Sequence, residues 1–130
     1  MDQNILQRCS QDSFAGTMTF PQVVAHLKDA GVQRYHVDLI GLRKSHYGHN
    51  DTVADLPLPL TDAPVVAQAF SRETVQRALV AVQHGQIGYP EFLRQIIVGG
   101  TVAYTVYLDG RQTVYVGRHG DQYVEPFPAL

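Results

Sequence analysis

One stretch of sequence decides the fold: FPQVVAHLKDAGVQRYHVDLIGLRKSHYG, residues 20–48. It returns in outline 69 residues later, without a gap, as YPEFLRQIIVGGTVAYTVYLDGRQTVYVG, residues 89–117. The shared residues are mainly glycines, prolines and the apolar residues of expected strands: Pro21/Pro90, Gly31/Gly100, Tyr35/Tyr104, Val37/Val106, Leu39/Leu108, Gly41/Gly110 and Gly48/Gly117. Such residues determine where a backbone turns and which strand face is buried. The sequence therefore predicts an internal duplication.

The same register extends beyond the two stretches. Gly16 aligns with Gly85, and Pro57-Leu58-Pro59 aligns with Pro126-Phe127-Pro128. The predicted repeats cover about 1–61 and 70–130, and the proline-rich segment DLPLPLTDAP joins them. Half of the chain is too short to bury both a sheet face and two helices comfortably. We therefore expect the two repeats to pack as one domain, 1–130.

Each repeat has the pattern helix, helix, then three strands. Apolar residues at positions i, i+3, i+4 and i+7 from Phe20 predict a helix that Thr19 caps and Gly31 ends. Alternating apolar residues between turn glycines predict the strands, with two-residue hairpin loops at Ile40-Gly41 and Asp109-Gly110. The expected fold class is α+β, with about four main helices and six antiparallel strands around a pseudo-two-fold axis.

The composition restricts the class of protein. Apolar residues make up 45% of the chain and charged residues 17%, with a net charge of −2. No basic stripe is present, so nucleic-acid binding is not expected. The single Cys9 excludes an internal disulfide, and its alignment with Ala78 predicts a small buried residue. The start MDQNILQRCS is unlike a secretory leader, and no apolar run has membrane-spanning length, so we expect a cytoplasmic protein without a membrane segment.

Polar residues of the first repeat form the candidate site set: His36, Asp38, Arg43, His46, His49 and Asp51. Strand alternation puts His36 and Asp38 on the face opposite Tyr35, and the hairpin predicts an Asp38–Arg43 ion pair. The same alternation points His36 away from His46, so three metal ligands are not expected to converge. Thr105 and Tyr107 stand at the places of His36 and Asp38 in the second repeat. We therefore assign no catalytic, cofactor-binding or metal-binding residue, and expect no cofactor.

Tyrosines are the other candidate functional residues. Tyr47, Tyr107 and Tyr123 could lie on a sheet face that the helices leave uncovered, or pack within the fold. A tyrosine-rich face is typical of protein interfaces. Stacking on single-stranded nucleic acid would also require a basic surround, which this sequence lacks.

The motifs FPQVVAHLKDAGVQRYHVD and IGYPEFLRQIIVGGTVAYTVYLDGRQTVYVGRHGDQYVEPFP resemble the YdfO-like family. This family comprises small uncharacterised bacterial and prophage-borne proteins, some of them labelled "phage envelope protein". The resemblance covers essentially the whole chain and implies an α+β fold. It supplies no catalytic or ligand residues to carry over. The envelope label fits poorly with a sequence that has no membrane segment.

Two classes of function follow from these observations. The first is a non-enzymatic cytoplasmic interaction or regulatory protein of prophage or mobile-element type, which binds an unknown protein partner or itself through the sheet. The alternative is a small-molecule binding or hydrolytic module that uses the polar set of the first repeat. A concave pocket that gathers three or more of those side chains would favour the alternative, and a flat face would favour the first.

Overall fold

The computed structural model describes residues 1–128 and arranges them as helix, helix and three strands, twice in succession. The first half contains α1 (Gln3–Ala15), α2 (Phe20–Asp29), β1 (Val32–Asp38), β2 (Arg43–Gly48) and β3 (Val53–Pro57). The second half contains α3 (Arg72–Gln83), α4 (Tyr89–Val98), β4 (Thr101–Tyr107), β5 (Gln112–Gly117) and β6 (Gln122–Pro126). Every element of the second half begins 69 residues after its counterpart. Residues 129–130, the end of the second predicted repeat, lie outside the described residues.

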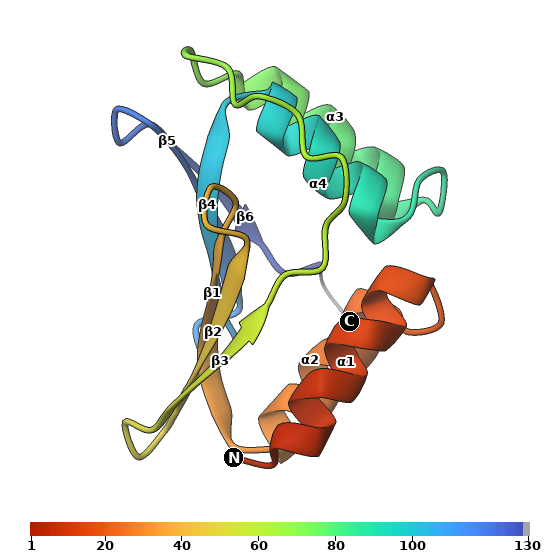
Figure 1. The fold of residues 1–130 in the computed structure, drawn as a ribbon, viewed down its shortest axis with the longest axis vertical. Coiled ribbons are helices and arrows are strands. Elements are labelled where there is room, and N and C mark those ends of the chain that lie inside the picture. The colour runs from red at the N-terminus through yellow and green to blue at the C-terminus, as the bar shows by residue number, and fades with distance from the viewer. Residues whose placement is uncertain (129–130) are drawn as a thin grey trace.

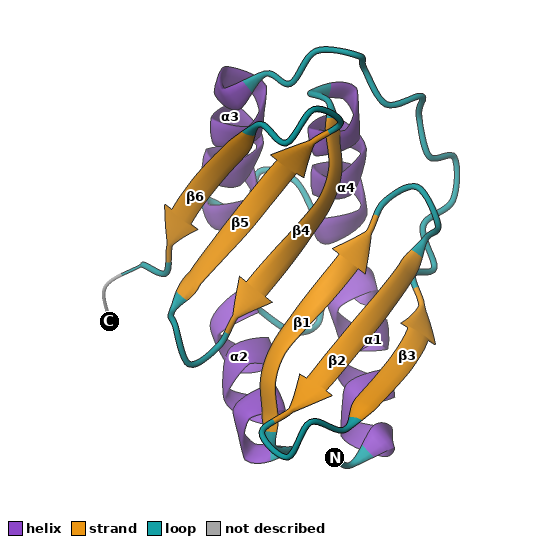
Figure 2. Ribbon diagram, turned by 90° about the vertical axis from the view of Figure 1, so that its left-hand side faces the viewer, coloured by secondary structure: helices purple, strands orange, loops and turns teal. Residues whose placement is uncertain are grey.

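The strands form a single six-stranded antiparallel sheet in the order β3-β2-β1-β4-β5-β6. All four helices lie on one face of this sheet, with α1 and α2 against one end and α3 and α4 against the other (Figure 1). The opposite face is not covered by any helix and is the one turned to the viewer in Figure 2. The α+β class predicted from the sequence is confirmed.

The two halves join through the pairing of β1 with β4, and this pairing has a symmetric register. His36 lies opposite Thr105, its own counterpart 69 residues later. On either side of this pair, Arg34 lies opposite Tyr107 and Asp38 opposite Ala103. A two-fold relation between the central strands requires this register. The duplication itself stays a prediction.

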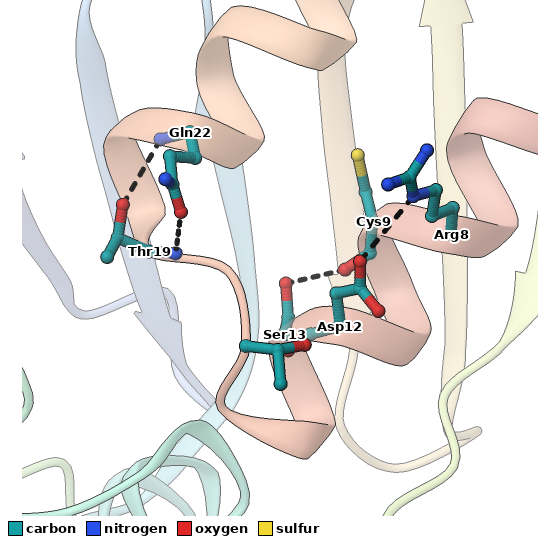
Figure 3. A network of polar contacts seen from close by, with 7 residues as sticks. Arg8, Cys9, Asp12, Ser13, Thr19 and Gln22 are labelled. Atoms are coloured by element: carbon teal, nitrogen blue, oxygen red, sulfur yellow. Dashed lines mark hydrogen bonds and ion pairs between the residues drawn. The ribbon is translucent and has the colours of Figure 1, made fainter.

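The helix ends follow the residues that predicted them. Thr19 accepts a hydrogen bond from the Gln22 backbone N–H, while the Gln22 side chain accepts one from the Thr19 N–H (Figure 3). This reciprocal cap satisfies two backbone donors that a helix start leaves free. Gly16 ends α1 with a φ of 75°, a left-handed conformation that favours glycine. Along α1 the Ser13 hydroxyl donates to the Cys9 carbonyl at 2.7 Å (Figure 3).

The hairpin turns differ from the prediction. β1 ends at Asp38 and β2 begins at Arg43, so the turn is longer than the two-residue loop expected at Ile40-Gly41. The positive φ of this turn falls on Leu42, at 53°, and that of the second hairpin falls on Arg111, at 56°. The predicted glycine loops are therefore wrong. The strand register is unaffected, because the longer turn has the same centre and still places Asp38 opposite Arg43.

The core lies between the helices and the covered face of the sheet. It includes Cys9, as predicted, and also residues of the connection between the halves: Leu58, Leu60 and Val66. Tyr123 also belongs to this side, because it pairs with the buried Tyr115, and their rings stack at 6.4 Å between centroids. Its possible place on the uncovered face is therefore corrected.

Candidate functional site

The predicted polar set does not form one site. His36 projects from the uncovered face, and its Nδ1 lies 2.8 Å from the Thr105 Oγ1. Asp38 accepts hydrogen bonds from the backbone N–H groups of Ile40 and Gly41, at 2.9 and 3.0 Å, and so holds the turn. The predicted Asp38–Arg43 ion pair is wrong. Arg43 instead pairs with Asp55 on the neighbouring strand β3, at 3.7 Å, while Asp38 directs one carboxylate oxygen, Oδ1, toward its own turn.

The remaining members of the set point elsewhere. His46 pairs with Tyr35 and faces the core. His49 lies in the β2–β3 turn, with its Nε2 2.8 Å from Asp109 Oδ2 in the β4–β5 turn. Asp51 lies in the same turn as His49, with a φ of 62°. Within residues 1–128, no group of three His, Cys, Asp or Glu side chains could hold a metal ion.

The uncovered side of the sheet, which carries no helix, is here called the open face (Figure 2). The strand registers assign alternate residues to it. From the first half it carries Arg34, His36, Asp38, Arg43, Ser45, Tyr47, Val53, Asp55 and Pro57. From the second half it carries Ala103, Thr105, Tyr107, Gln112, Val114, Val116, Gln122, Val124 and Pro126.

The two halves of the open face differ in chemistry. The first half holds all four of its charges, two arginines and two aspartates, and the Arg34 guanidinium lies 4.4 Å from the centre of the Tyr47 ring. The second half holds valines and no charge. Val53 is 56% exposed, Val124 42% and Tyr107 37%, so large apolar side chains of both halves of the open face are in contact with water. Tyr47 and Tyr107 thus lie on the face proposed for them.

Concave surfaces lie on the other side of the molecule. The first hollow, of about 370 Å³, lies between α3, α4 and the connection, and its lining includes Thr74, Arg77 and Arg94. The second, of about 410 Å³, lies along α3 and the segment that follows it. Neither contains any residue of the predicted polar set. Neither hollow lies on the open face.

A buried polar cluster lies beneath the first half of the sheet, formed by Cys9, Lys44 and His46 beside Tyr35. Lys44 is only 3% exposed, and its Nζ lies 4.6 Å from the centre of the Tyr35 ring. His46 is 0% exposed, and neither of its ring nitrogens has a hydrogen-bond partner among the described residues. Sequence analysis did not single out Lys44. The hairpin register could have predicted its burial, because it places Lys44 opposite Val37, whose side chain points into the core.

Burial determines the protonation of this cluster. Removal from water lowers the pKa of Lys44 from 10.5 to about 8. Burial, and secondarily the charge of Lys44, lowers the pKa of His46 from 6.5 to about 4. Burial raises the pKa of the Cys9 thiol, which makes the nucleophilic thiolate less available. All three side chains are buried and neither hollow is lined by them, so the cluster is part of the core.

None of the helices within residues 1–128 is long and apolar enough to cross a membrane.

Comparison with known proteins gives the relationship of the chain. Residues 11–125 match the family described as "Protein of unknown function (DUF1398)". The chain is also 31% identical, over 111 residues, to uncharacterised proteins of Mycobacterium bovis and Mycobacterium tuberculosis. These alignments cover 85% of this chain and 68% of each relative. The chain therefore belongs to the DUF1398 family of proteins of unknown function.

Proposed function

We propose that the chain is a non-enzymatic interaction protein that binds a protein chain through the open face of its sheet. The observation that carries the proposal is the one-sided placement of the helices, which leaves Val53, Val124 and Tyr107 exposed on the open face. Contiguous exposed apolar side chains favour protein binding, because their burial in an interface removes apolar area from water.

The edges of the sheet are less suited to binding than its face. The edge strands β3 and β6 are both short, and both end at a proline, Pro57 and Pro126. A second proline follows closely in each case, at Pro59 and Pro128. Proline has no N–H to offer to an added strand, and short edges resist strand addition. The proposal therefore assigns binding to the face.

Charge on the open face favours a protein over a nucleic acid. Its two arginines, Arg34 and Arg43, are balanced by Asp38 and Asp55. A face without net positive charge offers little attraction to a phosphate backbone. The alternative of a small-molecule or hydrolytic module loses support, because His46 lies on the covered face, His49 and Asp51 lie in the β2–β3 turn, and neither hollow gathers the other members of the set.

The resemblance to YdfO-like proteins, some of them prophage-borne, supports a prophage or mobile-element origin, and we propose a regulatory role in the cytoplasm. The proposal that the open face binds a protein does not depend on this location.

Photo-crosslinking in the cell that produces the protein tests the proposal. A photo-crosslinking amino acid is placed at Val124 or Tyr107 on the open face, or at Val80 (50% exposed) or Val98 (57% exposed) on α3 and α4 as matched controls. We expect a discrete protein adduct from the open-face positions and none from the helix positions. Absence of adducts at the open face, or equal adducts at all four positions, would contradict the proposal.

A further inference from the structure

We infer that the occupant of the open face is a second copy of this chain, which packs its own open face against it to give a four-layered helix–sheet–sheet–helix dimer. The inference rests on the proposed function, since it names the partner of the same face. It is carried by the size of the face and by the arrangement of its apolar and charged residues.

The face has the dimensions that a stable dimer needs. Six strands of 5–7 residues cover roughly 29 by 20 Å at the usual spacings of a sheet, about 600 Å² before side-chain relief is counted. Stable protein interfaces bury about 600–1,000 Å² on each partner, so the outline of the face reaches the lower end of that range. Two flat sheets also complement each other in shape and pack face to face about 10 Å apart.

The division of the face into charged and apolar halves selects one dimer axis. An axis that lies between the two sheets and runs across the strands places each half against the same half of the partner. The apolar residues Val114 and Val124, which pair with each other across β5 and β6, then meet the same residues of the second copy. An axis along the strands would instead bury the arginines and aspartates against valines, which costs desolvation without compensation.

The same axis pairs Arg34 with Asp38 across the interface. Arg34 and Asp38 lie two residues to either side of His36 on β1, and all three side chains project from the open face. We place the axis over the row of paired residues that crosses the sheet through His36, Thr105 and Val114. Rotation by half a turn about this axis exchanges the two ends of each strand. Arg34 therefore comes opposite the partner's Asp38, and Asp38 opposite the partner's Arg34. Two such ion pairs form in each dimer. Asp55 lies in the same row as His36, because Ser45 pairs with both, and so comes opposite the partner's Asp55, where each carboxylate keeps its contact with Arg43 of its own chain.

Sedimentation analysis of the full chain and its variants tests the inference. At ~100 μM, a hundredfold above a micromolar Kd, we expect the wild type to sediment at twice its monomer mass of 14.4 kDa. R34E, D38K and V114E should each lose the dimer, because they introduce like charges or bury a charge at the interface. The control V80E, on exposed α3, should keep it.

A mixing experiment tests the pairing directly. Equal amounts of R34E and D38K should recover the dimer, because the introduced glutamate faces the introduced lysine and the second ion pair is native. Circular dichroism monitors the fold of D38K, which also loses the acceptor for two turn N–H groups. If D38K does not fold, the loss of the dimer in R34E and V114E, with its retention in V80E, decides the matter.

Three results would overturn the inference: a monomeric wild type, a dimer insensitive to R34E and V114E, or folded single variants that do not recover on mixing. A monomeric wild type whose open face crosslinks to a different protein would overturn the inference and leave the proposed function intact. Absence of any adduct at the open face would overturn the proposed function itself.

Discussion

The strands β2 and β5 occupy equivalent places under the helices but present different chemistry to the core. Lys44 and His46 of β2 stand where β5 has Thr113 and Tyr115. The two halves nevertheless pair their rings with similar geometry. The ring centroids of Tyr35 and His46 lie 5.6 Å apart with an interplanar angle of 35°, and those of Tyr104 and Tyr115 lie 5.3 Å apart with an angle of 38°. The comparison teaches that the backbone specifies a ring at this place and not its polarity. The first half therefore carries buried polarity that the fold does not require.

The substitution Thr113→Lys, which gives the second half a buried lysine, should have the largest effect. Thr113 is 5% exposed, so the added ammonium loses water and the added methylenes overpack the core. We expect the free energy of unfolding to fall by about 3–5 kcal/mol in urea titrations at pH 7. Gln83→Lys, at the exposed end of α3, serves as the control and should change the free energy of unfolding little. A T113K variant as stable as wild type would show that both halves accept a lysine equally.

Acid should destabilise the protein through His46. Its pKa is about 4 in the folded chain against 6.5 in the unfolded chain. As the pH falls below 6.5 the unfolded chain binds this proton first, so stability declines down to about pH 4 and then levels. The loss amounts to about 3 kcal/mol. Urea titrations at several pH values should show this slope in wild type and in H26Q, and its removal in H46F. A persistent slope in H46F would assign it to another group.

Removal of the buried charge of Lys44 should stabilise the chain. The folded pKa of about 8 lies below the unfolded 10.5, so the penalty is complete below pH 8 and vanishes as the pH rises to 10.5. The contact of Lys44 with the Tyr35 ring offsets part of it. We expect Lys44→Met to raise the free energy of unfolding by about 2 kcal/mol at pH 7, with a smaller gain at pH 10. Lys28→Met, on exposed α2, is the control. An unchanged or lower stability of K44M at pH 7 would contradict this reading.

The smallest expected effect separates the two equivalent tyrosines. The Tyr104 hydroxyl forms a short hydrogen bond with the Tyr89 hydroxyl, whereas the Tyr35 hydroxyl has none among the described residues. Tyr104→Phe leaves the buried Tyr89 hydroxyl without its partner and should cost about 1–2 kcal/mol. Tyr35→Phe should change thermal stability much less. Equal effects of the two substitutions would contradict the assigned difference.

Local sequence features predicted local structure well. Helical periodicity and caps located the helices, and alternation correctly separated His36 from His46, because both signals act over a few residues. The partner of Arg43 was mispredicted because Asp55 comes from a third strand, whose pairing no hairpin reveals. The contact between His36 and Thr105 was missed for a similar reason, since it requires the order of strands across both halves. The prediction of the hairpin turns was wrong because Leu42 and Arg111 adopt a positive φ, a conformation that sequence patterns assign to glycine.

The candidate site was harder to predict than the fold. A polar set with plausible residue types was visible in the sequence, but side chains of one set can point to both faces of a sheet. The open face becomes visible only when all four helices are placed, because each helix alone has an apolar stripe that could cover either side.

The symmetric pairing of β1 with β4 has a consequence for the order of folding. Within each half, neighbouring strands are joined by short turns, so their hairpins can close on the microsecond scale. The His36–Thr105 contact instead joins residues 69 apart, and closing so long a loop costs entropy before any contact repays it. The two hairpins should therefore form early and independently, and their meeting along β1 and β4 should limit the folding rate. The centre of the sheet is then the last part of it to form.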